Sequence, residues 1–562
     1  MKSKLFTCLT MLFFSLSLVA QPKKVSGTVV DNIGPVIGAS VVEKGTSNGV
    51  ITDLDGNYTL NVPQGAVLVF SSIGYKDVEV TVGTSSVYNV TLEEDRLLLD
   101  EVVVVGYGTM KKSDLSGASV SMKEEDLKAT IITSLDQTLQ GRAAGVQAVT
   151  TSGAPGSSSS IRVRGQATIN ANAEPLYVID GVIVQGGGNS GADFGLGDAL
   201  GNGKVSTISP LSTLNPADIV SMEILKDASA TAIYGAQGAN GVVLITTKRG
   251  KSGDAKISYD GMFAVSQQTR RLDMMNLREY AQFYNDLVSV GELSKPNEVY
   301  SDPSILGVGT NWQDAIFRTA LQHQHQLSAS GGTDKVQYYV SGSYVDQEGT
   351  IIGSNFDRFS VRTNIDAQLK SWIKLGLSAT FANTNDDLKL ADSSEGLIYY
   401  SLSTIPDIPI YDVDGNYSST VREGYNNPNP VALAMEDQIL LKRQKLTGNI
   451  YADITPFVNF KPLKNLVWRT EVGFDFGWSK GERFEPALTL GSWSRKSNRS
   501  SIQNNRNTYW QIKNYLTYNN TFGKHNISAM IGQEMWESRW EYISAEGTNL
   551  PSNEVHSPVL GT

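Results

Sequence analysis

The 562-residue sequence has one cysteine, only four histidines and no block of lysine or arginine residues. Because Cys8 lies in the apolar N-terminal stretch, the rest of the chain has no thiol for disulfides, nucleophilic catalysis or metal ligation. A net charge of −10 gives no support to nucleic-acid binding, which depends on neutralising phosphates. After the first twenty residues, no apolar run reaches the roughly eighteen residues that a membrane-spanning helix needs. Passage through a membrane would therefore require strands that close into a β-barrel.

The first twenty residues have the pattern of a secretory signal peptide. Lys2 and Lys4 give a basic start, and an apolar stretch follows over residues 5–20. We predict cleavage after Ala20. A membrane anchor is the alternative, but the stretch is short for a span and no stop-transfer pattern follows it.

Glycine and tyrosine are abundant, with 53 and 23 residues, which suits a β protein with many turns. In residues 23–96, short β-prone runs alternate with turn clusters, and this predicts a β-sandwich. The acidic run that starts at Asp53 has its glycine at position four rather than six, so it predicts a hairpin turn, not a calcium loop. The run at 412–416 has the same reading. The predicted strands are 25–30, 39–43, 58–62, 67–71, 77–82 and 88–92.

A connector at 97–109 contains four consecutive valines, which form a strong strand without an obvious partner. An ordinary buried strand of a neighbouring domain is the alternative. Residues 110–252 read as mixed α/β, with a helix predicted at 134–144 and a glycine-rich loop at 186–203. The predicted strands of this region are 160–163, 176–179, 219–225 and 242–247, with a turn or short helix around 228–234.

Beyond residue 253, apolar and polar residues alternate repeatedly over segments of about ten residues. At 468–478, for example, Val472 and Phe474 alternate with Glu471 and Asp475. This pattern is typical of strands with lipid outside and water inside, with Trp468 and Trp478 in the aromatic girdles. A soluble sandwich also alternates, but repetition after a signal peptide favours a membrane barrel. The nine predicted strands are 257–265, 322–330, 336–344, 358–367, 373–381, 446–454, 468–478, 511–521 and 525–535.

Nine strands with open edges are not viable in lipid, because unpaired backbone groups would face hydrocarbon. We therefore expect the chain to be a fragment of a longer protein. Several long motifs, in the same order, resemble the SusC/RagA family of TonB-dependent outer-membrane transporters. The motifs are VSGTVV at 25–30, DLDGNY at 53–58, SIGYK at 72–76, LDEVVVVGYGT at 99–109, IRVRG at 161–165, PLYVIDG at 175–181, the runs 223–235 and 238–250, WQDAIFR at 312–318 and YVDQEG at 344–349.

The resemblance implies a mostly β protein built from several domains. It implies a signal peptide at 1–20, a carboxypeptidase-regulatory-like β-sandwich extension at 21–96, a TonB box and linker at 97–109, a mixed α/β plug at 110–252 and a partial antiparallel transmembrane β-barrel at 253–562. The 186–203 loop looks longer than usual for the family's plug. The family's barrel also has more strands than this chain supplies.

The resemblance further implies active import of an oligosaccharide or peptide across the outer membrane, without a cofactor. The expected partners are TonB with its inner-membrane energising complex, a SusD-like surface lipoprotein and outer-membrane lipid. The N-terminal extension is expected in the periplasm. No zinc pair, nucleophile elbow or acid–base pair is evident, so we predict that the protein is not an enzyme. The alternative is a receptor for signalling or adhesion that transports nothing.

The implied site residues fall into three groups. TonB would bind Asp100, Glu101, Val102, Val103, Val104, Val105 and Gly106, by adding this segment to its own sheet. The plug motif comprises Arg162, Arg164, Gly165, Asp180, Gly181, Glu223, Lys226 and Gly235. The aromatic candidates for ligand contact are Trp312, Tyr399 and Tyr400, although core packing is the commoner role for such residues.

Two expectations concern polar residues of the predicted barrel interior. Plug charges, including Arg249, are expected to pair with wall acids such as Glu471 or Asp475, or else to be solvated in the lumen. His323 and His325 lie two apart on a predicted strand. Without a third ligand in the sequence, we interpret them as a pair facing the lumen and not as a metal site.

Overall fold

The computed structural model describes residues 23–31, 34–46, 48–72, 75–92, 102–105, 108–111, 119–128, 135–150, 152–157, 159–165, 173–184, 210–293, 295–389, 396–419, 425–460, 463–523 and 525–562. Four predicted features lie outside these ranges: the signal peptide, the 186–203 loop, the Asp100–Glu101 pair and Gly106. The chain divides into two compact units, residues 1–103 with 110–114, and residues 104–109 with 115–562.

The first unit is a β-sandwich, as predicted. Its two sheets have the strand orders β4-β1-β7 and β3-β2-β5-β6, and they enclose a core that includes Val25, Tyr58 and Phe70. The acidic run at Asp53 forms the predicted turn, in which its carboxylate accepts hydrogen bonds from the backbone N–H groups of Asp55 and Asn57. The strands are β1 (Lys23–Val30), β2 (Ser40–Glu43), β3 (Gly49–Ile51), β4 (Asn57–Val62), β5 (Val67–Ser71), β6 (Val78–Thr81) and β7 (Val90–Thr91).

The four valines form strand β8 (Val102–Val105), which pairs with β9 (Gly108–Lys111) in an isolated two-stranded sheet. Two-stranded hairpins are at best marginally stable in water. The valine strand thus has a pairing partner, β9, that the sequence did not suggest. The pairing is weak, because the sheet has only two strands.

The plug region forms a five-stranded sheet in the order β10-β15-β16-β13-β14 and a separate β11-β12 pair. The predicted helix at 134–144 is wrong. Leu135 and Leu139 are buried as its pattern required, but they lie on a 3₁₀ helix that Gly141 ends with a φ of 71°. The elements are β10 (Ser119–Lys123), α2 (Glu124–Lys128), η2 (Leu135–Leu139), β11 (Val146–Thr150), β12 (Ser159–Val163), β13 (Leu176–Ile179), β14 (Val182–Val184), η3 (Pro210–Thr213), η4 (Pro216–Asp218), β15 (Ile219–Leu225), α4 (Ala228–Thr231), η5 (Ala232–Gly238) and β16 (Val242–Thr247).

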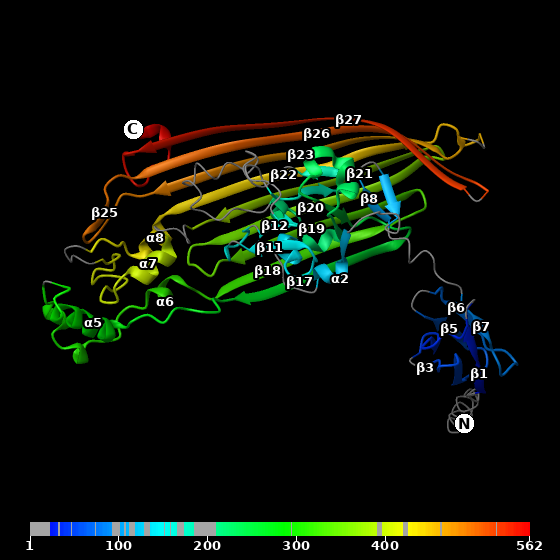
Figure 1. Cartoon of the computed structure of the whole chain (residues 1–562), viewed down its shortest axis with the longest axis horizontal. Coiled ribbons are helices and arrows are strands. Elements are labelled where there is room, and N and C mark those ends of the chain that lie inside the picture. The colour runs from blue at the N-terminus through cyan, green and yellow to red at the C-terminus, as the bar shows by residue number, and fades with distance from the viewer. Residues whose placement is uncertain are drawn as a thin grey trace, which may run out of the picture. The chain divides into compact units, whose positions relative to one another are not determined.

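Nine long antiparallel strands form one sheet, here called the wall, in the order β17-β18-β19-β20-β21-β22-β23-β26-β27 (Figure 1). All nine predicted strands are confirmed. They are longer than predicted, up to 24 residues, and extend well past the apolar segments that predicted them. The strands are β17 (Gly253–Ser266), β18 (Ala320–Gly332), β19 (Val336–Glu348), β20 (Asn355–Lys370), β21 (Ile373–Asp387), β22 (Gln438–Ile454), β23 (Leu466–Glu485), β26 (Arg499–Phe522) and β27 (His525–Thr548).

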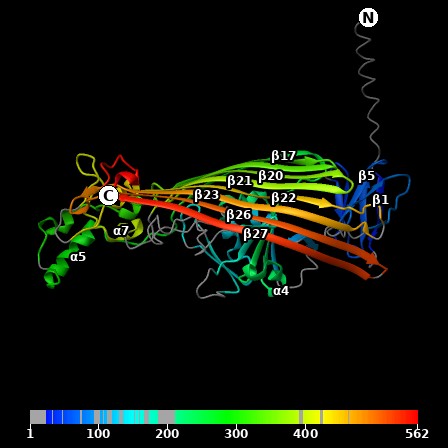
Figure 2. The same cartoon turned by 90° about the horizontal axis from the view of Figure 1, so that it is seen from above.

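The two faces of the wall have opposite character. Val472 and Trp478 on β23 are about 40% exposed, whereas Glu471 and Asp475 on the same strand are almost fully buried. The plug packs against this polar face, and Figure 2 shows its elements on one side of the wall strands. The wall therefore buries polar residues against the plug and exposes apolar ones, as lipid-facing strands do.

The connections between wall strands are short at one end and long at the other. The long connections carry four helices (Figure 1), and three of these helices supply Trp312, Leu397 and Val431 to a small apolar core. No helix within the described ranges is both long and apolar enough to cross a membrane. The elements of this end are α5 (Leu277–Ser289), η6 (Glu298–Tyr300), η7 (Pro303–Ile305), α6 (Trp312–Ile316), α7 (Leu397–Ser403), α8 (Pro430–Glu436), β24 (Leu488–Leu490), β25 (Trp493–Arg495) and η9 (Pro558–Leu560).

Candidate functional site at the plug–wall interface

A tight turn joins β13 to β14 and faces the wall. The register pairs Ile179 with Val182, so the loop consists of Asp180 and Gly181 alone. Both residues have positive φ values, 47° and 89°, as a two-residue hairpin of the primed type requires. Aspartate and glycine are residues that tolerate this conformation. The Asp-Gly pair thus presents one carboxylate and two carbonyl groups to the wall.

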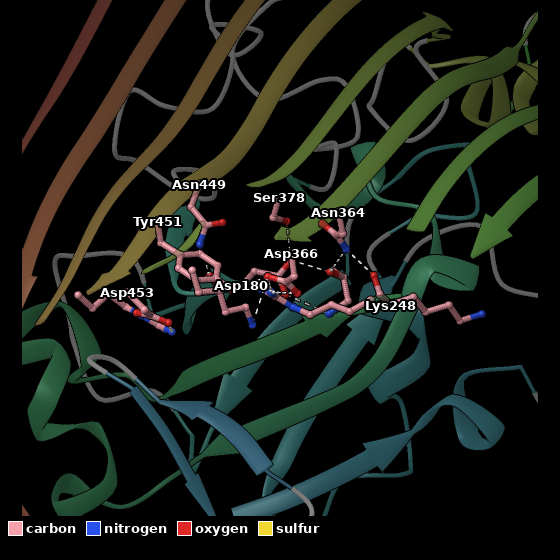
Figure 3. A network of polar contacts seen from close by, with 12 residues as sticks. Asp180, Lys248, Asn364, Asp366, Ser378, Asn449, Tyr451 and Asp453 are labelled. Carbon is pink, nitrogen blue, oxygen red and sulfur yellow. Dashed lines mark hydrogen bonds and ion pairs between the residues drawn. The ribbon is translucent and has the colours of Figure 1, made fainter. Parts of the chain in front are cut away.

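The carboxylate of Asp180 is the centre of a buried polar network (Figure 3). Within the plug, it accepts hydrogen bonds from the backbone N–H (3.1 Å) and the hydroxyl (2.6 Å) of Thr247 on β16. From the wall, Arg362 of β20 donates at 2.5 Å and Ser378 of β21 at 3.1 Å. The side chains of Asp180 and Arg362 are each only 3% exposed. This contact is a buried ion pair with additional hydrogen bonds.

The carbonyl groups of the turn bind two further wall strands. Asn449 of β22 donates to the Asp180 carbonyl at 2.9 Å (Figure 3). Gln511 and Lys513 of β26 donate to the Gly181 carbonyl at 2.9 Å and 2.8 Å. One two-residue turn is therefore attached to β20, β21, β22 and β26.

The environment of Asp180 fixes its charge. Burial alone would raise the pKa of this carboxyl group, but Arg362, Arg249 and the hydrogen bonds from Thr247 outweigh burial and hold the pKa below its ordinary value. The carboxylate is consequently ionised at neutral pH and matches the guanidinium of Arg362.

The segment that leaves β16 makes a second attachment. Arg249 forms an ion pair of 3.3 Å with Asp366 of β20, and the Tyr451 hydroxyl donates to the same carboxylate. Burial would lower the pKa of the Arg249 guanidinium, but Asp180 and Asp366 raise it above its ordinary value. Asn364 donates to the Lys248 carbonyl (Figure 3). The plug is thus held at the point where its chain enters the wall.

A third attachment surrounds η4. One oxygen of Asp218 accepts from Gln326 of β18 at 2.8 Å and from Tyr339 and Ser341 of β19 at 2.7 Å and 2.8 Å. Nearby, the fully buried Arg358 of β20 donates to the carbonyls of Ser212 and Leu214 at 2.7 Å and 2.6 Å. The donors to Asp218 are neutral, in contrast to the charged donor at Asp180.

The chemistry of these attachments is polar throughout. A buried ion pair contributes little net stability compared with an apolar contact of equal size, but breaking it leaves a costly unpaired charge. A dry apolar interface would resist separation over its whole area, whereas hydrogen bonds across a polar interface can be exchanged for hydrogen bonds to water.

Comparison with known proteins gives the same architecture. A carboxypeptidase-regulatory-like domain model matches residues 25–104, and the TonB-dependent receptor plug domain model matches residues 111–242. TonB-dependent receptor SusC of Bacteroides thetaiotaomicron is 34% identical over 98% of this chain and 54% of its own length. TonB-dependent receptor P3 of Formosa agariphila is 33% identical over 99% of this chain and 52% of its own length. The chain belongs to the SusC/RagA family of TonB-dependent receptors.

The solved structure of the RagAB peptide importer in its open-open state superimposes with a TM-score of 0.68 at 25% identity. The match covers 82% of this chain and 52% of that one. This SusC/RagA chain spans about half the length of the curated relatives it matches. The curated relatives are named TonB-dependent receptors, and the RagAB structure is named a peptide importer.

Most of the predicted plug-motif charges of this SusC/RagA chain make contacts inside the plug. Arg164 forms an ion pair with Asp227, and Lys226 donates to the Ala144 carbonyl at 2.8 Å. Glu223 is buried within β15, and Arg162 lies on β12. Gly165 and Gly235 adopt positive φ values of 91° and 58° at turns. These residues shape the plug, whereas Asp180 and Gly181 attach it to the wall.

The predicted pairing of Arg249 with a wall acid occurs, but the choice of acid was wrong. The partner is Asp366, whereas Asp475 lies 3.4 Å from Lys445 of the neighbouring wall strand. Sequence analysis also missed Arg362 and Asp218 as attachment residues. The position of Arg362 could have been noticed, because it is a charged residue on the polar face of a predicted strand. The neighbouring sequence, however, does not show which plug residue it pairs with.

The aromatic candidates for ligand contact all lie at the long-connection end. Trp312 is 2% exposed, and its indole N–H donates to the Ile405 carbonyl at 3.0 Å, so it packs in the core of that end. Tyr399 is 48% exposed on α7, and Tyr400 is half-buried beside it. Of the three, Tyr399 presents the most ring surface to solvent.

The lumen-facing interpretation of His323 and His325 is wrong. On β18 the even-numbered Gln326 donates to Asp218 of the plug, and Gln322 is buried on the same face, so the odd-numbered histidines point outward. There, the rings of both histidines lie within 6.1 Å of Phe263. Among the residues that the structure describes, no group of three potential ligands could hold a metal ion.

Proposed function

We propose that the protein is a TonB-dependent importer that moves a bulky nutrient, an oligosaccharide or a peptide, across the outer membrane. The observation that carries the proposal is the polar attachment of the plug to the inner face of the wall at Asp180. A plug held in this way closes the passage at rest and needs work to release it. The RagAB relative is a peptide importer, which supports the transport of a large solute.

The wall supports a location in the outer membrane. Apolar residues recur at every second position of a wall strand and point outward, such as Leu375, Leu377 and Ala379 on β21. The residues between them are mostly polar, point inward and are covered by the plug. Barrels of this kind have short periplasmic turns and long extracellular loops. The long connections with helices α5 to α8 would then lie outside the cell, and the extension at 21–96 in the periplasm.

We propose that TonB binds residues 100–106. The described part, β8, has β9 as its partner in a sheet of only two strands, so little stability would be lost on release. A released valine strand can add to the edge of another sheet and gain affinity from backbone hydrogen bonds. Force on this strand would then separate the Asp180 turn from the wall.

A SusD-like lipoprotein is the proposed partner at the cell surface. The long-connection end exposes apolar side chains, including Phe283, Val290 and Ile305. A lipoprotein seated there would capture the nutrient and deliver it to the wall interior, where Tyr399 is a proposed contact. Signal-peptide cleavage after Ala20 belongs to the same proposal.

The test is uptake of labelled nutrient by cells that carry a single backbone change in the TonB segment. Val104→Pro removes one backbone N–H and should abolish uptake, whereas Val104→Thr keeps the backbone donor and a β-branched side chain and should preserve it. Surface abundance and ligand binding to intact cells should be equal for both variants. Wild-type uptake by the proline variant would contradict binding of TonB at this segment.

The same experiment separates the importer from a receptor that transports nothing. A signalling or adhesive receptor would bind ligand at the surface without moving it into the periplasm. Absence of uptake in wild-type cells, with ligand binding intact, would favour that alternative. Co-purification of a lipoprotein with trapped oligosaccharide or peptide would identify the substrate class.

A further inference from the structure

The outward face of the wall changes from apolar to charged along one boundary near the long-connection end. On β22, Ile450 and Leu446 give way to Lys442, and on β23 Phe476 and Trp478 give way to Lys480. The antiparallel register places Lys442 directly opposite Lys480. The boundary therefore crosses neighbouring strands at one level, as the edge of a membrane-facing band does.

A groove of about 500 Å³ lies on this boundary. Its lining includes three basic side chains, Lys442, Lys480 and Arg506, and one acidic side chain, Glu541. Trp478 lines the groove on the apolar side, and the register pairs it with Arg506 of β26. The groove is thus basic within a chain whose net charge is −10.

The arrangement of the basic residues destabilises the sheet through charge repulsion. Like charges directly opposite on neighbouring strands repel, and Lys442 and Lys480 are such a pair. Lys480 is offset by Glu482 at 2.6 Å. Within the described part of the chain, neither Lys442 nor Arg506 forms an ion pair, and both are exposed. The register places Glu541 of β27 opposite Arg506, and Glu541 also forms an ion pair with Arg539 at 2.5 Å. Lys442 has no acidic residue opposite it on either neighbouring strand. Three basic side chains beside one acid and a tryptophan are suited to an anionic group that also carries an apolar part.

We propose that this groove binds the phosphate groups of an anionic glycolipid in the outer leaflet. The inference rests on the proposed location in the outer membrane. Lys442, Lys480 and Arg506 would contact the phosphates, and the guanidinium offers a paired donor geometry. The acyl chains would lie on the apolar band below, along Phe476 and Leu446, with Trp478 at the level of the headgroup.

A free phosphate or a protein partner fits the groove less well. Phosphate alone would make no use of the apolar band that continues from Trp478. A protein partner would have to reach a surface whose neighbouring rows face hydrocarbon. A lipid satisfies both the basic groove and the apolar band, because its headgroup and chains are joined at this level.

The test uses the full-length receptor purified in a mild detergent, with native mass spectrometry to count bound lipid. The probe is a lipid A carrying two phosphates, and the comparison lipid is its dephosphorylated form. The test variant is Lys442→Gln with Arg506→Gln. The control is Lys370→Gln with Lys464→Gln, which removes the same charge at the short-turn end of the wall. Each basic residue near an anionic surface strengthens binding about fivefold, so the test variant should bind roughly tenfold or more weakly.

The expected result is retention of phosphorylated lipid A by the wild type and the control, with loss in the test variant. Equal retention by the test variant and the control would overturn the proposal, as would equal retention of dephosphorylated lipid. Full displacement by millimolar inorganic phosphate would also overturn it, by showing a site for the free ion. The measurement requires neither TonB nor nutrient. It therefore tests lipid binding even if the importer proposal fails.

Discussion

Replacing Asp180 with alanine should release the plug from the wall. The change leaves the Arg362 guanidinium, 3% exposed, without its carboxylate. Removing one partner of a buried ion pair typically costs about 3–5 kcal/mol, because the remaining charge is unpaired. The Thr247 hydroxyl and backbone N–H and the Ser378 hydroxyl also lose their acceptor. We take about 3–5 kcal/mol as the expected loss of docking free energy.

Hydrogen–deuterium exchange on the purified receptor measures this loss. Peptides covering 176–184 and 242–249 report on the plug, and peptides from β21 and β22 report on the wall. Local opening free energies set the exchange rates of protected amides. A loss of about 3–5 kcal/mol should raise exchange at docking-dependent plug amides by roughly a hundredfold to several thousandfold, with the wall unchanged. Asp260→Ala, which removes an exposed carboxylate on β17, is the matched control.

A second substitution distinguishes an unpaired charge from general damage. Adding Arg362→Met to Asp180→Ala removes the orphaned guanidinium, and buried pairs replaced by apolar groups are often neutral in stability. Most of the lost protection should therefore return in the double variant. If Asp180→Ala leaves plug exchange unchanged, or if the methionine restores nothing, the ion pair is not what holds the turn.

Three further predictions use the same exchange measurement. Asp180 has its pKa lowered from 3.8, so its stabilising contribution is complete above pH 3.8 and is lost as the pH falls through the lower folded value. The wild type and Asp180→Asn should therefore differ at neutral pH, begin to converge only below pH 3.8, and coincide once the pH is below the folded pKa of Asp180. Asp218→Asn should cost less than the loss of Asp180, about 1–3 kcal/mol at β15, because the hydrogen-bond donors to Asp218 are neutral; a larger loss would show that attraction to the nearby Arg358 guanidinium contributes more than these hydrogen bonds. A Cβ on Gly473 would lie 2.8 Å from Gln511 and 3.0 Å from Val182, so Gly473→Ala should break the Gln511 bond to the plug turn and cost about 1 kcal/mol at β14; unchanged exchange there would show that the side chain adapts.

The nine wall strands were predictable because their signal is local. Alternation of apolar and polar residues with period two reports which residues share a face, whatever the strand pairs with. On β23 the alternation identified both the outward residues, such as Val472, and the inward ones, such as Asp475. The bounds of β13, β15 and β16 also matched, since each is a compact run of β-branched and apolar residues.

Predictions that depended on contacts with residues distant in the sequence were less accurate. The spacing of Leu135 and Leu139 fits a helix, but Gly141 with its positive φ ends it after one turn of 3₁₀ geometry. The outward position of His323 follows from the register of β18 against the plug, which the polar nature of histidine obscured.

By itself, the sequence determined the kind of molecule: a β-sandwich extension, a valine strand, a plug and a wall with one apolar face. Only the tertiary structure decided how plug and wall meet. In the sequence, the Asp180-Gly181 pair indicates only an ordinary hairpin turn. In the fold, side chains of β20, β21, β22 and β26, up to 332 residues away, donate hydrogen bonds to this turn. The periodicity of a strand can be recognised from neighbouring residues in the sequence. The pairing of buried charges depends on which strands, distant in the sequence, lie next to each other in the fold.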